Sequence, residues 1–126
     1  MHELSIAESI LDAVRTELTH RPGARLTRIG LCIGEMAAVD PESLKFCFES
    51  IVRGTGWETV QLETRISPAR RICIKCSHEF VVKDYNRVCP VCLSELTEAN
   101  GGDELDFDYL EIETDGTLAA QIQSTQ

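Results

Sequence analysis

Four cysteines in the middle of the chain form two CxxC pairs, and their spacing is suited to metal binding. The set consists of Cys73, Cys76, Cys89 and Cys92, with twelve residues between the two pairs. Two residues between cysteines allow both thiolates of a pair to turn toward one ion. Two such pairs complete the four-thiolate shell of a structural zinc site. The spacing therefore predicts a small zinc(II) module and leaves open what the rest of the chain does.

We interpret this module as structural rather than catalytic. A catalytic zinc site usually has three protein ligands and one open position, whereas here four thiolates fill the shell. A segment this short cannot bury a sufficient core alone, so metal binding is expected to supply its folding free energy. His78 follows Cys76 by two positions, and we interpret it as a surface or outer-shell side chain rather than a ligand.

The first residues of the chain offer a second set of metal donors. The α-amine of Met1, the amide nitrogen of residue 2 and the imidazole of His2 can chelate one ion through fused small rings. Nickel(II) and copper(II) favour planar nitrogen sites of this kind. The alternative is that Met1, His2 and Glu3 are frayed residues before a helix, as is common at a chain terminus.

Composition and charge narrow the classes of function. The chain has 126 residues, a formal net charge of −9 and 43% hydrophobic residues, which is enough for one domain, with or without a small insert. Its acidity disfavours nucleic acid and anionic membrane surfaces as partners. The sequence begins without a signal peptide and contains no long apolar run. We therefore expect a cytoplasmic protein whose paired cysteines bind metal rather than form disulfides.

Two helices and three strands are expected to position these residues. Apolar residues at helical spacing predict a helix over 5–19, and Asp40 followed by Pro41 predicts a second helix that ends before Gly54. Alternating patterns predict strands over 26–33, 59–67 and 105–113. Within the cysteine segment, residues 79–83 are expected to form a short strand of a zinc hairpin.

These elements predict an α+β fold with an inserted module. The body is a small mixed α/β unit of two helices on a three-stranded sheet, built discontinuously from residues 1–68 and 103–114. The zinc-binding domain, a four-cysteine ribbon, occupies 69–102, and residues 115–126 are expected to form a flexible tail. The body is predicted to be discontinuous because the last strand would otherwise be an exposed edge without a partner.

Several segments, taken together, carry a family resemblance over nearly the whole chain except the tail. They are the opening Met1-His2-Glu3-Leu4-Ser5, the passage Ile33-Gly34-Glu35 with Val39-Asp40-Pro41-Glu42-Ser43-Leu44, the stretch from Phe46 to Phe48, the two CxxC pairs and the closing strand. In combination they resemble the HypA/HybF family of hydrogenase maturation factors, although each motif alone is unspecific.

The resemblance implies a nickel metallochaperone rather than an enzyme. It implies that His2 and the Met1 amine, with main-chain amides, bind nickel(II), and that Glu3 contributes through its amide or side chain. The four cysteines are implied to bind zinc. Nickel would pass to the large-subunit precursor of a [NiFe]-hydrogenase with the help of the GTPase HypB, and in some organisms to urease. Neither a nucleic acid nor a membrane is an expected partner.

Two other classes of function stay open from the residues alone. A zinc-ribbon adaptor for nucleic acid or transcription would fit the ribbon spacing and the basic residues among the cysteines, but the overall acidity and the lack of interleaved aromatic residues count against it. A thiol–disulfide enzyme could use a CxxC motif, but the pairing of two motifs and Pro90 inside the second favour metal binding.

Overall fold

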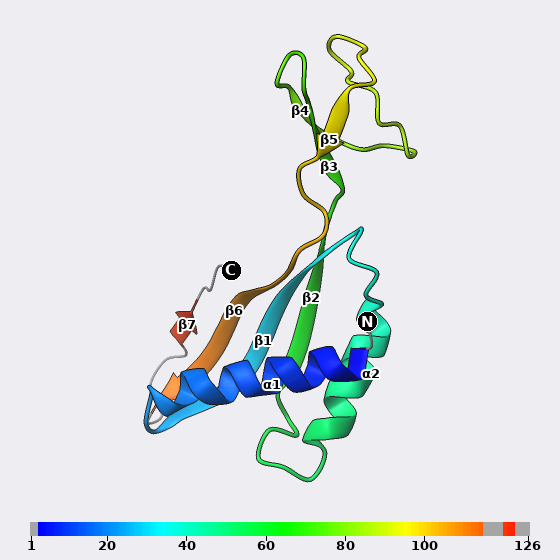
Figure 1. The fold of residues 1–126 in the computed structure, drawn as a ribbon. Helices are drawn as coiled ribbons and strands as arrows, with labels where there is room; N and C mark the ends of the chain where they lie inside the picture. The colour runs from blue at the N-terminus through cyan, green and yellow to red at the C-terminus, as the bar shows by residue number, and fades with distance from the viewer. Residues whose placement is uncertain (1–2, 115–119, 123–126) are drawn as a thin grey trace. The chain divides into compact units, whose positions relative to one another are not determined.

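The computed structural model describes residues 3–114 and 120–122 of the chain (Figure 1). Its elements are, in order, α1 (Glu3–Thr19), β1 (Ala24–Gly34), α2 (Pro41–Val52), β2 (Gln61–Ser67), β3 (Arg70–Cys73), β4 (Glu79–Val81), β5 (Thr97–Ala99), β6 (Leu105–Thr114) and β7 (Ala120–Ile122). Helices and strands form a mixed α+β fold, so the predicted fold class is confirmed. Met1, His2 and most of the predicted tail lie outside the described residues.

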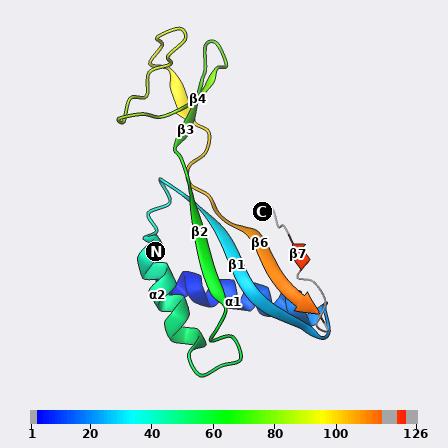
Figure 2. The ribbon, with the colours of Figure 1, turned by 180° about the vertical axis from the view of Figure 1, so that it is seen from behind.

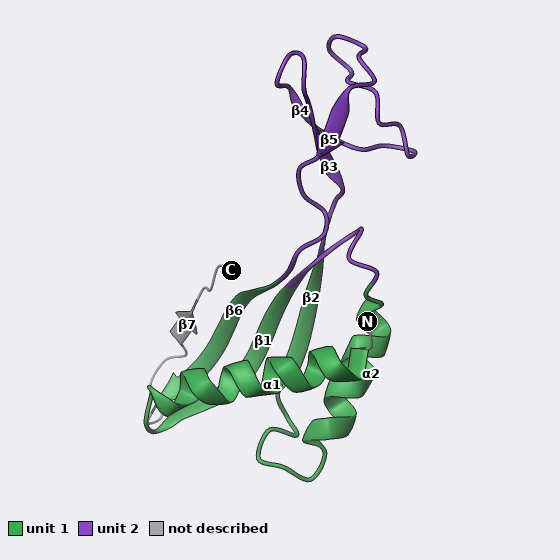
Figure 3. Ribbon diagram, viewed as in Figure 1, with its two compact units in different colours: residues 1–31, 39–65, 106–126 green, residues 32–38, 66–105 purple. Residues whose placement is uncertain are grey.

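The chain divides into two compact units (Figure 3). The first unit comprises residues 1–31, 39–65 and 106–126, and the second comprises 32–38 and 66–105. Both units are discontinuous in sequence. The second contains all four cysteines of the CxxC pairs, together with the short strands β3, β4 and β5.

Helices α1 and α2 form because each presents one apolar stripe, and α2 also has a capped beginning. The buried residues of α1 recur at helical spacing: Ile6, Ala7, Ile10, Leu11 and Val14. At the start of α2, the carboxylate of Asp40 accepts the backbone N–H of Glu42 over 3.2 Å, and Pro41 occupies the first turn. The buried side chains of α2 are Leu44, Phe48 and Val52. Both predicted helices are therefore confirmed, with α1 beginning at Glu3 rather than at residue 5.

The larger sheet has the strand order β2-β1-β6-β7, so β2 lies at one edge. Strands β1 and β2 run in the same direction and are joined by α2, whereas β6 runs antiparallel to β1 (Figure 1). Two contacts show this antiparallel register: Arg25 forms an ion pair with Glu113, and the Thr27 hydroxyl donates to the Glu111 carbonyl. The three expected body strands are present, and β7, within the predicted tail, adds a short fourth strand. Figure 2 shows this sheet from behind.

The second unit contains a three-stranded sheet of order β4-β3-β5, in which both pairings are antiparallel. In β3, Arg71 is paired with Phe80 on one side and with Ala99 on the other. The predicted strand over 79–83 is present as β4 and is shorter than expected. Strands β3 and β5 were not predicted, because neither of these short segments shows clear alternation.

An ion pair between Arg70 and Glu104 joins the two ends of the second unit's long segment. The carboxylate of Glu104 also accepts the N–H of Gly102 over 2.8 Å. The pKa of Glu104 is lowered by a bond from its own backbone N–H, by Arg70 and by the Gly102 N–H. These bonds favour the charged carboxylate and thereby stabilise the folded unit.

Replacing Glu104 with Gln removes its ion pair with Arg70 and is expected to lower the free energy of unfolding by about 1 kcal/mol at neutral pH. The loss is no larger because both side chains are partly exposed, and water weakens their attraction. A carboxylate with a lowered folded-state pKa stabilises the fold above its ordinary pKa of 4.5, and this contribution is lost as the pH falls through the folded-state value. Urea unfolding of both proteins as a function of pH checks this. The difference in unfolding free energy between the two proteins should begin to narrow near pH 4.5 and close as the pH falls through the lower folded-state pKa. A difference that is constant with pH would contradict the assignment.

Candidate metal centre

Each CxxC pair lies in a tight loop of the second unit, and the two loops have the same hydrogen-bond pattern. In the first, the N–H of Ser77 donates to the Cys73 carbonyl over 2.9 Å; in the second, the N–H of Leu93 donates to the Cys89 carbonyl over 2.9 Å. Ser77 and Leu93 both have left-handed backbones, with φ values of 64° and 63°. The repeated turn aims the two cysteines of each loop toward one point.

The four sulfur atoms lie within 4.8 Å of one another. The Sγ atoms of Cys73 and Cys92 are 3.5 Å apart, and those of Cys76 and Cys89 are 3.6 Å apart. Four sulfurs at about 2.3 Å from a tetrahedral zinc ion would be about 3.8 Å from one another. The donor set and its spacing therefore fit zinc without rearrangement of the loops, and each close contact joins the two CxxC pairs.

Backbone and sulfur neighbours shift the thiol pKa values in opposite directions. The N–H of Cys76 donates to the Cys73 sulfur over 3.4 Å and lowers the pKa of that thiol to about 6. The N–H of His78 acts to lower the pKa of Cys76, but burial and the neighbouring thiols outweigh it and raise that pKa to about 12. Burial acts to raise the pKa of Cys89 as well, but the N–H groups of Cys92 and Val91 outweigh it and lower that pKa. Two thiolates therefore form readily, while the Cys76 thiol opposes deprotonation. A divalent cation removes this opposition by neutralising the thiolates.

The site is closed on one side and accessible on the other. Cys73 and Cys89 are buried, whereas Cys76 and Cys92 are exposed. His78 lies outside the sulfur cluster; its carbonyl accepts the Cys73 N–H over 2.9 Å, and its ring stacks on Phe80. Within residues 3–114 and 120–122, no other group of three or more His, Cys, Asp or Glu side chains is close enough to share an ion.

Of the three N-terminal residues predicted to bind nickel, the structure describes only Glu3. Met1 and His2 lie outside the described residues, but Glu3 begins α1. The carboxylate of Glu3 accepts the backbone N–H of Asp40 over 3.2 Å, which ties the start of α1 to the start of α2. Sequence reasoning identified Asp40 only as a helix cap. It missed this contact because the two residues are 37 positions apart.

No helix within the described part of the chain is both long and apolar enough to cross a membrane.

Comparison with known proteins gives a consistent result over nearly the full chain. Residues 1–112 match the profile of a family described as hydrogenase/urease nickel incorporation, metallochaperone, hypA. The hydrogenase maturation factor HypA of Azotobacter vinelandii is 36% identical over 113 residues, covering 90% of this chain and 100% of the relative. That of Pelodictyon phaeoclathratiforme is 37% identical over 116 residues, covering 92% of this chain and 99% of the relative.

Solved structures share the fold. The solution structure of the nickel metallochaperone HypA from Helicobacter pylori superposes with a TM-score of 0.61 at 23% identity, covering 90% of this chain and 97% of that one. A second solution structure, of a HypA protein, has a TM-score of 0.66 at 25% identity and covers 90% of this chain and 96% of the other.

Proposed function

The chain belongs to the HypA family of metallochaperones for nickel incorporation into hydrogenase and urease, and from this premise we propose that its N-terminal motif binds the nickel. The ligands in this proposal are the imidazole of His2, the amine of Met1 and main-chain amides. Nickel(II) favours such nitrogen donors. The ion is cargo, so it must be bound firmly enough to be collected and loosely enough to be released.

The contact between Glu3 and Asp40 supports a role for the first turn of α1. The carboxylate of Glu3 accepts the Asp40 N–H over 3.2 Å, which holds the first residue of α1 at the start of α2. In the proposal, Glu3 offers its amide to nickel while its side chain stays bonded to the Asp40 N–H. A chelate anchored in this way loses less conformational entropy on binding than one on a free terminus.

In this proposal the cysteines bind a metal that stays in place, whereas the N-terminal motif binds a metal that is released. Cys73, Cys76, Cys89 and Cys92 bind zinc permanently and hold the ribbon, residues 69–102, in its folded form. The α/β domain, residues 1–68 with 103–114, carries nickel. An N-terminal site built from an amine, amides and an imidazole loses its ion as acidity rises, because all of these groups must shed protons to bind. The two sites therefore hold different metals without exchange.

The chain thus acts as a carrier and not as a catalyst. Its proposed acceptor is the large-subunit precursor of a [NiFe]-hydrogenase, its proposed helper is the GTPase HypB, and urease maturation is a second destination. All of this takes place in the cytoplasm, without nucleic acid or membrane. The observation that carries the proposal is the family match across residues 1–112, which includes the Met-His-Glu opening.

Nickel transfer to a purified hydrogenase large-subunit precursor tests the proposed delivery. Nickel-loaded protein is mixed with the precursor and HypB, the proteins are separated, and nickel is measured in the precursor. We expect faster loading than from an equal concentration of nickel held by a small chelator of matched affinity. Equal rates from protein and chelator would contradict delivery while leaving nickel binding itself intact.

A further inference from the structure

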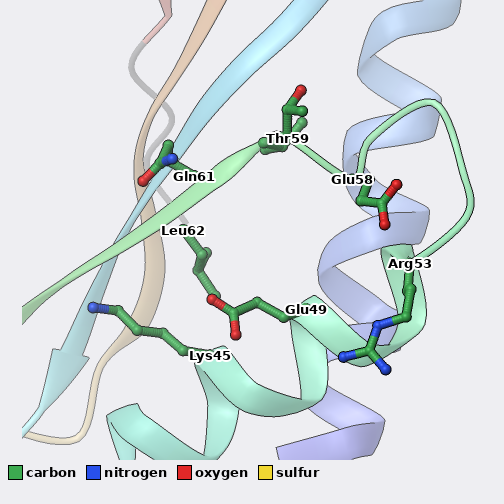
Figure 4. Close-up of a pocket in the computed structure, with 8 residues that line it drawn as sticks. Lys45, Glu49, Arg53, Glu58, Thr59, Gln61 and Leu62 are labelled. Carbon is green, nitrogen blue, oxygen red and sulfur yellow. The ribbon is translucent and has the colours of Figure 1, made fainter.

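A groove of about 370 Å³ lies between α2 and β2 in the first unit, and residues of neither metal site line it. Its walls come from successive turns of α2 and from the chain that leads into β2 (Figure 4). The lining residues are Lys45, Glu49, Arg53, Glu58, Thr59, Val60, Gln61 and Leu62. Gln61 and Leu62 begin β2, the edge strand of its sheet, so the groove opens onto the start of a strand edge.

The backbone of β2 offers hydrogen-bonding groups along this edge. The carbonyl of Ser67 accepts the N–H of Glu35 over 2.7 Å at the end of β1, so Ser67 bonds toward β1. Backbone groups of successive residues in a strand point to opposite sides, so the N–H and C=O of Thr64 point away from β1. An edge strand leaves such groups free to pair with another extended chain.

The charges along α2 and at its C-cap, Arg53, are spaced to match an extended chain. Lys45, Glu49 and Arg53 alternate in sign at intervals of four residues, and none forms an ion pair among the described residues. Four helical residues advance about 6 Å. Two residues of an extended strand advance about 6.6 Å, so its same-side side chains recur at nearly the same interval. A strand beside β2 could therefore place one side chain opposite each charge.

We propose that this groove binds an extended segment of a partner protein, which adds to the edge of β2 as a further strand. The segment carries an acidic, a basic and an acidic side chain at alternate positions, facing Lys45, Glu49 and Arg53. Main-chain bonds to β2 supply affinity, and the three charges select the sequence. The acidic, basic, acidic order of the segment is the same from either end, so the segment could pair with β2 in a parallel or an antiparallel orientation.

A second copy of this chain fits the groove less well than such a segment. In a two-fold antiparallel pair of β2 strands, equivalent faces lie on the same side of the joint sheet. The second copy would present Leu62 and Thr64 toward α2, and these side chains carry no charge. It would also bring its own α2 to the same side of the joint edge.

Titration of the zinc-loaded full chain with a synthetic peptide tests the proposal. The peptide alternates valine with aspartate, lysine and aspartate, and binding is followed by amide chemical shifts. We expect the largest shifts in β2 at Leu62, which lines the groove, and at Thr64, the next residue whose backbone groups point away from β1. Replacement of Thr64 by Pro removes the outward N–H but no bond to β1, so we expect loss of binding with an unchanged circular dichroism spectrum. Absence of shifts in β2 would overturn the proposal.

Charge reversal separates specific recognition from general attraction. The double variant K45E/R53E makes positions 45, 49 and 53 all acidic, and we expect it to bind the peptide at least about tenfold more weakly. It should instead bind a peptide with lysine at all three positions. K83E/R87E makes the same change in net charge outside the groove and should bind as the unaltered chain does. Equal losses in both variants, or a dimer formed through β2 that the peptide does not dissociate, would overturn the proposal.

Discussion

Replacement of Cys73 by Ser is expected to abolish stable zinc binding and to unfold the three-stranded sheet of the second unit. Cys73 ends β3, is 1% exposed and contributes one of four clustered sulfurs. Structural zinc in small modules supplies about 10–16 kcal/mol of apparent binding free energy at neutral pH. Few buried apolar side chains of the second unit are available to replace it, so loss of the ion should remove most of that unit's stability.

Elemental analysis and amide spectra of the purified variant measure this effect. We expect less than one zinc per chain and collapsed signal dispersion for residues 66–105, while the helices of the first unit keep their signals. Cys47→Ser is the matched control, because Cys47 lies in α2, away from the sulfur cluster. A Cys73→Ser protein with one tightly held zinc and an unchanged spectrum would show that the four-cysteine centre is not the structural site.

Replacement of His2 by Ala is expected to weaken nickel binding by more than about 100-fold, beyond the 10–100-fold typical of changes outside the ligand shell. The imidazole is the side-chain nitrogen donor of the proposed chelate, and alanine offers nothing in its place. Zinc content should not change, because the cysteine centre shares no residue with the N-terminal motif. Calorimetric titration with nickel, on protein that begins at Met1, measures the difference.

The control for this experiment is His20→Ala, which removes an exposed histidine just after α1. We expect nickel affinity in that variant to equal the affinity of the unaltered chain. Nickel binding that is unchanged in His2→Ala but reduced in His20→Ala would move the nickel site away from the N-terminal motif.

Local signals in the sequence predicted local features of the structure well. The Asp40-Pro41 pair predicted the start of α2, because a cap and a proline act on the turn that directly follows them. The CxxC spacing predicted the sulfur cluster, because two loops that each turn a pair of thiolates toward one point can together bind a single metal ion. The two loops share the same turn.

Features that depend on contacts between residues far apart in the sequence could not be predicted from local patterns. Strands β3 and β5 contain four and three residues, too few to show alternation, and they exist as strands because they pair with each other. The contact of Glu3 with Asp40 depends on how α1 packs beside α2. Gly30 is a third example. A Cβ there would lie 2.1 Å from the Tyr109 ring, a neighbour that only the sheet order brings close.

The groove beside β2 was also invisible in the sequence. Lys45, Glu49 and Arg53 have the spacing of an ordinary solvated helix face, and nothing local distinguishes them from one. The strand order shows that these three side chains lie beside the edge strand of the sheet, which the sequence alone does not reveal. The sequence therefore predicted the four-cysteine cluster, whereas the groove beside β2 was found only in the structure.

One added residue before Met1 is the most direct test of nickel binding at the N-terminal motif. The addition moves the α-amine out of the chelate but leaves every side chain of the protein in place. Nickel and zinc are measured together, by titration and elemental analysis, on the native and the extended chain. The proposal predicts that the extension abolishes tight nickel binding and leaves zinc untouched. Nickel affinity that survives the extension would contradict the N-terminal site.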